Sequence, residues 1–227
     1  MSSTLEKVEN LGINERLNIF LQRNRKTFII GFGGLLVLLA GVIAFFLIRD
    51  SLEAKAVSAV ENFTRRYEAL SAELNEPGKA GEVQALQDEL SEFAAKHRGY
   101  AGARSCSLLA NIHAEKKEWA EAEQAWAKAA GLAPKTYLAP VFLFNAAVAA
   151  EEQGNIAGAI ELYANVVSLK DIFPSAPRAQ FSIGRLQETQ KNNEAALEAY
   201  RAVINNWPGE AVWANLAQNR ILVINRQ

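Results

Sequence analysis

A length of 227 residues with 24 basic and 25 acidic side chains gives a formal net charge of −1, without the basic excess that nucleic-acid binding requires. The single cysteine, Cys106, excludes an intrachain disulfide, and the only histidines, His97 and His113, are too few for a zinc site. We therefore expect no metal, no other cofactor and no nucleic-acid partner.

Residues 28–48 form one uninterrupted apolar run, FIIGFGGLLVLLAGVIAFFLI, after a short polar segment over residues 1–27 in which Asn14 is predicted to cap a helix. At a rise of about 1.5 Å per residue, the run crosses a hydrocarbon layer of roughly 30 Å and predicts one transmembrane helix. A cleaved signal peptide is the alternative, because residues 54–56, Ala-Lys-Ala, fit a cleavage site. The run is longer than the apolar core of about 7–15 residues in signal peptides, which favours an uncleaved anchor.

The charges beside the span predict its orientation. Arg23, Arg25 and Lys26 lie directly before it, and only Arg49 lies equally close behind it. Because basic residues stay in the cytoplasm, we predict a single-pass inner-membrane protein with a cytosolic N-terminus and a periplasmic, or otherwise extracytoplasmic, domain over residues 49–227. A wider window gives equal numbers of basic residues on both sides, and a domain that faces the cytosol is the alternative.

Residues 49–102 are expected to form a capping pair of helices. An alanine-rich stretch up to Asn75 has apolar side chains at intervals of three and four, which predicts one amphipathic helix that the membrane helix enters directly or after a kink. Asn75 to Gly78 ends this helix, and a second helix follows over residues 83–97.

The rest of the chain repeats itself at a period of about 37 residues. Ala122, Ala159 and Ala196 are evenly spaced, and so are the aromatic residues four positions after each. These positions match the tetratricopeptide repeat, a pair of helices of about 34 residues, and the extra residues are expected in the connecting loops. We predict repeats over residues 103–136, 140–173 and 177–208, and a capping helix over residues 209–227. The buried side of this last helix is expected to carry Val212, Trp213, Leu216, Ile221 and Val223.

Helix packing explains the repeated positions. Two helices approach closely only where small residues lie at the crossing, and an aromatic side chain fills the gap between successive repeats. The packing positions are Ala110, Ala122, Trp126, Ala147, Ala159, Tyr163, Gly184, Ala196 and Tyr200. The predicted fold class is therefore all-α: one N-terminal transmembrane helix followed by a tetratricopeptide-repeat α-solenoid with terminal capping helices.

The outward side of each repeat's first helix is predicted to line a groove for a protein or peptide. Aromatic and arginine side chains flanked by acids suit an extended polypeptide. The predicted groove residues are Arg104, Ser107, Asn111, Val141, Phe144, Val148, Glu151, Arg178, Phe181, Arg185 and Glu188. Burial of Phe144 and Phe181 against the next helix is the alternative. Ser107 and Phe144 stand where a carboxylate clamp would use lysine, which argues against such a clamp.

No combination of nucleophile, base and acid stands out, and we do not expect an enzyme. Cys106 takes a position where the repeat pattern has a bulky apolar residue, which predicts a buried, unreactive thiol. His113 is interpreted as a packing residue, and Glu151 with Glu152 as a solvated helix end.

The order of the segments resembles that of a known family. Asn24-Arg25-Lys26 precede a glycine-rich start of the span at Gly31, Gly33 and Gly34, residues 67–70 end the first helix behind it, and the repeats follow. In this layout the chain resembles the bacterial ancillary subunits of the Sec translocon. The resemblance implies a non-enzymatic protein with a periplasmic tetratricopeptide domain, which sits beside the translocon and passes emerging polypeptides to folding factors.

A scaffold that assembles an envelope complex is the alternative function. In that case the groove is idle, and the outer face or the membrane helix makes the contacts. Residues 93–103, FAAKHRGYAGA, resemble the repeats of periplasmic envelope coordinators, which slightly favours the scaffold.

Overall fold

The computed structural model describes residues 12–74 and 76–226, and the regular structure in these ranges is entirely helical. The predicted all-α class is therefore confirmed. The chain divides into two compact units between Ala54 and Lys55, a boundary that falls inside the long helix α3 (Arg25–Leu70).

The first unit contains α2 (Ile13–Arg23) and the beginning of α3. The predicted cap at Asn14 is wrong, because Gly12 is the N-cap of α2 and Asn14 lies inside the helix. The carbonyl of Gly12 accepts the N–H groups of Glu15 and Arg16 at 3.0 and 3.1 Å. The apolar part of α3 has a mean hydropathy of 2.6, and the described chain buries none of it, so this helix is long and apolar enough to cross a membrane.

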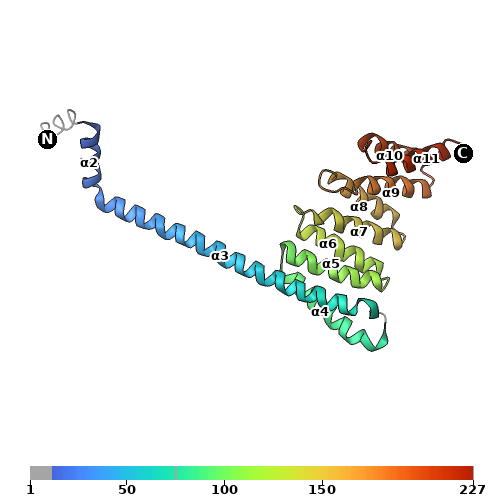
Figure 1. Ribbon diagram of the computed structural model, residues 1–227, viewed down its shortest axis with the longest axis horizontal. Coiled ribbons are helices and arrows are strands. Elements are labelled where there is room, and N and C mark those ends of the chain that lie inside the picture. Colours follow the sequence, from blue (N-terminus) through green and yellow to red (C-terminus); the bar gives the residue numbers. More distant parts are fainter. Residues whose placement is uncertain (1–11, 75, 227) are drawn as a thin grey trace. The chain divides into compact units, whose positions relative to one another are not determined.

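The second unit is a stack of helix hairpins that follow one another in chain order (Figure 1). Residues 55–70 of α3 and α4 form its beginning, where Arg66 and Glu89 make an ion pair of 2.5 Å. The elements after α3 are η1 (Ser71–Glu73), η2 (Pro77–Lys79), α4 (Ala80–Lys96), α5 (Gly99–Glu115), α6 (Trp119–Leu132), α7 (Leu138–Glu152), α8 (Ile156–Ser168), α9 (Ala176–Thr189), α10 (Asn193–Asn206) and α11 (Ala211–Ile224). Helices α5 and α7 begin a few residues before the predicted repeats, and the division into three repeats with caps stays a prediction.

The turns inside the hairpins α5–α6, α7–α8 and α9–α10 share one backbone structure. The middle residue, Lys117, Gly154 or Lys191, has a φ of 60°, 82° or 61°. The next N–H group reaches back five positions to a carbonyl at 2.8–2.9 Å, and the middle N–H group reaches back three positions at 2.9 Å. This is the Schellman ending of a helix. Its recurrence at the spacing of the sequence period shows that the period is structural.

Every predicted packing position is buried. The alanines among them are fully buried, and Tyr163 and Tyr200 fill the space between neighbouring helices. Gly184 is needed because the ring of Tyr200 lies against it: a Cβ at this position would come within 2.6 Å of the ring. Small residues therefore set how closely the first and second helices of a hairpin approach.

Candidate protein-binding site

The predicted groove residues lie on α5, α7 and α9, the first helices of the three hairpins. We use the name first-helix face for the outward sides of these helices and of α11. Arg178 and Arg185 are exposed there, whereas Ser107 and Phe144 are buried, with 4% and 8% of their surface exposed. The half-buried members are Arg104, Asn111, Val141, Val148, Glu151, Phe181 and Glu188.

Phe144 belongs to the core rather than to an open groove. Its ring meets the ring of Tyr163 edge to face, with the centroids 5.3 Å apart, and Phe173 lies beside it. The guanidinium of Arg178, on α9, covers the ring at 4.8 Å from its centroid. A ligand on the first-helix face would therefore meet Arg178 before Phe144.

An ion pair links α7 and α9. Arg185 Nη2 donates to Glu151 Oε2 at 2.6 Å. The sequence predicted that Glu151 belongs to a solvated helix end, but its carboxylate is engaged by Arg185. Burial raises the pKa of the Tyr163 phenol to about 12, and the charge of Glu151 contributes to this shift.

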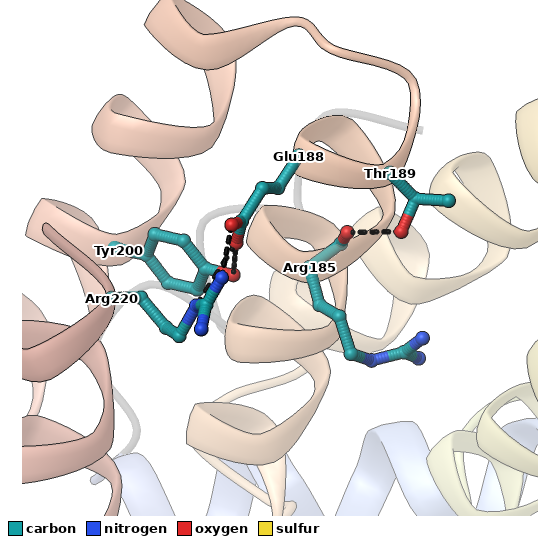
Figure 2. Close-up of polar contacts among 5 residues, drawn as sticks. All are labelled: Arg185, Glu188, Thr189, Tyr200 and Arg220. Atoms are coloured by element: carbon teal, nitrogen blue, oxygen red, sulfur yellow. Dashed lines mark hydrogen bonds and ion pairs between the residues drawn. The ribbon is translucent and has the colours of Figure 1, made fainter. Parts of the chain in front are cut away.

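A second and tighter polar cluster links α9, α10 and α11 (Figure 2). The carboxylate of Glu188 accepts the Tyr200 hydroxyl at 3.0 Å and the Arg220 Nε at 3.1 Å, and Arg220 Nη2 donates to its other oxygen. The hydrogen bond from Arg220 lowers the pKa of Glu188. Burial, and then the contact with Glu188, raises the pKa of Tyr200. Both side chains are thus held in one ionisation state near neutral pH.

A pocket of about 370 Å³ opens beside this cluster on the first-helix face. Its lining is formed by Phe181, Arg185, Glu188, Thr189, Tyr200 and Arg220. The side chain of Arg185 points away from Glu188 in this view (Figure 2). The hydroxyl of Thr189 donates to the backbone carbonyl of Arg185 at 2.9 Å. A guanidinium has five N–H donors, so each arginine keeps donors for a ligand beyond those used by its glutamate. The pocket therefore offers an aromatic ring, donors and acceptors to a polar, extended chain.

The predicted groove residues of the first repeat lie near α3, away from the pocket beside Glu188. Arg104 lines a pocket of about 320 Å³ together with α3 residues, and Asn111 makes a hydrogen bond with Tyr67. The structure therefore divides the predicted groove into one cluster near α3 and another on α7 and α9, which α11 extends through Arg220.

Sequence reasoning missed Arg220, Thr189 and Trp213 as neighbours of this site. Helix α11 was interpreted only as a cap, and Val212, Leu216 and Val223, which were expected on its buried side, are exposed. Arg220 repeats the role of Arg185 one hairpin later, and a comparison of α11 with the first helices is the signal that could have found it.

Cys106 and His113, the other candidates for chemistry in the sequence, have structural roles. Cys106 is buried, and this burial raises the pKa of its thiol, in agreement with the prediction of an unreactive side chain. His113 makes a polar contact and is not a pure packing residue, because its Nδ1 lies 2.6 Å from Glu118 Oε2. In the described residues, no group of three or more His, Cys, Asp or Glu side chains could hold a metal ion.

A stack of helix hairpins with the same turn at a spacing of 37 residues defines a helical repeat protein. Residues 144–211 match the family model of the tetratricopeptide repeat. A TPR repeat-containing protein from Treponema pallidum (strain Nichols) is 31% identical over 229 residues, covering 92% of this chain and 93% of that protein. The chain therefore belongs to the tetratricopeptide-repeat family.

A solved structure supports the same fold. A crystal structure of the nearly identical TPR-like repeats of a putative kinesin light chain from Podosopora anserina matches with a TM-score of 0.53 and 15% identity, covering 74% of this chain and 86% of that chain. At this identity the likeness concerns the fold alone. Tetratricopeptide-repeat families are generally non-enzymatic scaffolds, and protein–protein interaction is the class of function that the family gives to this chain.

Proposed function

We propose that the protein is a membrane-anchored adaptor that binds proteins or peptides outside the cytoplasm, beside the Sec translocon, and assists translocated or envelope proteins. The observation that carries the binding function is the pocket beside the Glu188 cluster. It combines the aromatic ring of Phe181 with the unused donors of Arg185 and Arg220. Aromatic and arginine side chains are the residues that most often dominate the energy of protein interfaces.

The pocket fits an extended polypeptide better than a compact charged ligand. Each arginine that lines it already faces a glutamate, so the pocket has no large net charge. A peptide backbone with alternating donors and acceptors can use both kinds of group, and its side chains can contact Phe181. Arg178 extends the same surface along α9 and is exposed.

The proposed anchor is the apolar part of α3. Its mean hydropathy of 2.6 and its unburied side chains support a membrane span. Arg23, Arg25 and Lys26 precede the apolar residues and support an N-terminus in the cytoplasm. The proposed place beside the translocon rests on the resemblance of the layout to the ancillary Sec subunits.

Site-specific crosslinking tests the binding site. A photo-reactive amino acid at Thr189, which is exposed and lines the pocket, should capture extracytoplasmic polypeptides in growing cells. The variant Arg178→Ser/Arg185→Ser should reduce this capture by about a hundredfold, since each of the two arginines loses a hydrogen bond to a charged group that contributes about 1.5 kcal/mol. The matched control Lys128→Ser/Arg201→Ser removes two exposed charges from α6 and α10 and should leave the capture unchanged.

Equal loss in the two double variants would mean that net charge and not the pocket matters. Unchanged capture in both would overturn the binding site and favour a scaffold that works through another face. A topology reporter fused after the C-terminus tests the location separately. An active periplasmic reporter is expected, and a reporter that is active only in the cytosol would replace the proposal by a cytosol-facing scaffold.

A further inference from the structure

Helix α2, shortly before the apolar part of α3, has an apolar side that stays exposed. The helix contains no buried residue, and with about 100° between successive residues four of its apolar side chains occupy a sector of about 100°. These residues, which we call the α2 face, are Ile13, Leu17, Phe20 and Leu21, with exposed fractions of 85%, 55%, 55% and 42%. Ile19 is the one apolar residue of α2 that lies outside this sector.

The charges of α2 are arranged around the α2 face. Arg16 and Arg23 lie at its edge, within about 60° of Phe20, whereas Glu15 lies nearly opposite its centre. Residues 12–27 carry four basic side chains and one acidic side chain. This distribution is typical of a helix on an anionic lipid surface, because basic side chains beside the apolar side reach the headgroups while the acid points into water.

The chain bends at Asn24, between α2 and α3 (Figure 1). Asn24 is the C-cap of α2, with a φ of −105° and a ψ of 15°. Its backbone N–H and its side-chain Nδ2 both donate to the carbonyl of Phe20, at 3.1 and 3.0 Å, and its own carbonyl accepts the N–H of Phe28 at 3.0 Å. The bend is therefore a local feature of the first unit, held by hydrogen bonds on both sides of Asn24.

The inner side of this bend is apolar and belongs to both helices. The rings of Phe20 and Phe28 meet edge to face, with their centroids 5.8 Å apart. A mainly apolar pocket of about 470 Å³ opens beside them, lined by Phe20, Asn24, Thr27, Phe28, Gly31, Phe32 and Leu35. At Phe20 the α2 face therefore turns toward the same side as Phe32 and Leu35, which belong to the apolar run of α3.

We propose that α2 lies along the cytoplasmic surface of the membrane, with the α2 face in the lipid and acyl chains in the pocket at the bend. The inference rests on the proposed membrane span of α3. It goes beyond that span, because a membrane anchor requires neither an amphipathic helix nor a bend before it. When one arm of a bent helix pair crosses a bilayer and the other lies on its surface, the inner side of the bend faces the lipid.

Lipid fits the α2 face better than a protein partner does. The acyl chains that surround Phe32 and Leu35 of a spanning α3 already occupy the side toward which Phe20 turns. A helix of 11 residues is too short to be stable by itself in water, so α2 gains stability from a surface that is always beside it. Lying on the surface, α2 keeps the beginning of α3 at the headgroups.

Fluorescence quenching of the full-length chain in nanodiscs of phosphatidylethanolamine and phosphatidylglycerol tests the proposal. An environment-sensitive dye is attached to Leu17→Cys on the α2 face, to the control Gln22→Cys about 140° around the helix, and to Leu38→Cys in the apolar run. Cys106 is buried and stays unlabelled. The quenchers are iodide in water and lipids that carry a nitroxide either near the headgroup or deep in the acyl chain.

The expected result is a difference between the two sides of α2. The shallow lipid quencher should act on the Leu17 label about threefold or more as strongly as on the Gln22 label, and iodide should show the reverse, because a surface helix buries its apolar side roughly 5–10 Å into the lipid. Adding Phe20→Glu should bring the lipid quenching of the Leu17 label down to the level of the Gln22 label. The matched change Ile19→Glu lies outside the α2 face and should leave it unchanged.

The Leu38 label separates this inference from the proposed anchor. If the deep lipid quencher acts on Leu38 while the Leu17 and Gln22 labels behave alike, the surface position of α2 is overturned and the anchor stands. If it does not act on Leu38, the anchor itself fails. A Leu17 label that is shielded from both iodide and lipid would mean that protein covers the α2 face, and it would overturn the proposal, as would equal effects of Phe20→Glu and Ile19→Glu.

Discussion

The close contact between α9 and α10 at Gly184 provides a sharp stability test. Gly184 lies on α9, and a Cβ built on it would sit 2.6 and 2.7 Å from Cε1 and Cδ1 of Tyr200. The ring cannot simply move aside, because it is fully buried and its hydroxyl is tied to Glu188 at 3.0 Å. Gly184→Ala must therefore push α9 and α10 apart.

The expected magnitude follows from two opposing effects. Overpacking a core costs about 1–3 kcal/mol, whereas replacing glycine by alanine inside a helix contributes about 1 kcal/mol of stability. Because the ring is fully buried and held by Glu188, we take a cost in the upper part of this range, about 2–3 kcal/mol, and expect Gly184→Ala to lower the free energy of unfolding by about 1–2 kcal/mol. Urea unfolding followed by tryptophan fluorescence measures this, because all four tryptophans, at positions 119, 126, 207 and 213, belong to the second unit.

A matched glycine makes the test specific. Gly131 lies on α6, and nothing would come within 4 Å of a Cβ there, so Gly131→Ala should stabilise the protein by up to about 1 kcal/mol. The cost of Gly184→Ala should also shrink in a Tyr200→Leu background, because the ring atoms that cause the collision are gone. If Gly184→Ala proves as stable as the wild type, the argument that glycine sets the α9–α10 distance is refuted.

Two further changes test the polar contacts of the second unit. Glu188→Gln should lower the free energy of unfolding by about 1 kcal/mol at pH 7. Arg220 favours the ionised form of Glu188, so the folded-state pKa lies below the ordinary glutamate value of about 4.3. The difference between variant and wild type should therefore disappear as the pH falls below about 4.3 and through the lower folded-state pKa. Unfolding curves at pH 7, 5 and 3 measure this, and a constant difference would contradict it. Ser105→Ala should raise the free energy of unfolding by about 1 kcal/mol, since the buried hydroxyl has no hydrogen-bond partner, whereas Ser168→Ala at the surface should change it by less than about 0.5 kcal/mol. A loss of stability in Ser105→Ala would mean that the hydroxyl does make a stabilising contact.

The local pattern of the repeats could be read from the sequence because it depends on short-range physics. Ala122, Ala159 and Ala196 recur at one period, and the structure has the same Schellman turn before each of them. Such a turn requires a left-handed residue, and the sequence signalled only one of the three with a glycine, since Lys117 and Lys191 take this conformation as well. The 37-residue period was recognised in the sequence from the sizes of the packing side chains and not from the turn residues.

The candidate site was predicted only in part, because its members come from different hairpins. Phe181, Arg185 and Glu188 were found from their place on the first helix of the third repeat. The burial of Phe144 was left open, since it depends on Tyr163 and Arg178 from neighbouring helices. Arg220 was missed because its pairing with Glu188 joins residues far apart in the chain.

The sequence by itself determined that this protein is helical, that it repeats and that it carries one apolar helix long enough for a membrane, because hydrophobic periodicity and residue size act within a few residues of chain. Only the tertiary structure decided which charges are already paired and which sides remain open. Glu151 and Glu188 pair with arginines from the first helix of the next hairpin or from α11, and Val212, Leu216 and Val223 of α11 are exposed because no helix of the described chain packs on them. Pairing and exposure depend on what the neighbouring hairpin presents, and a single repeat does not contain that information.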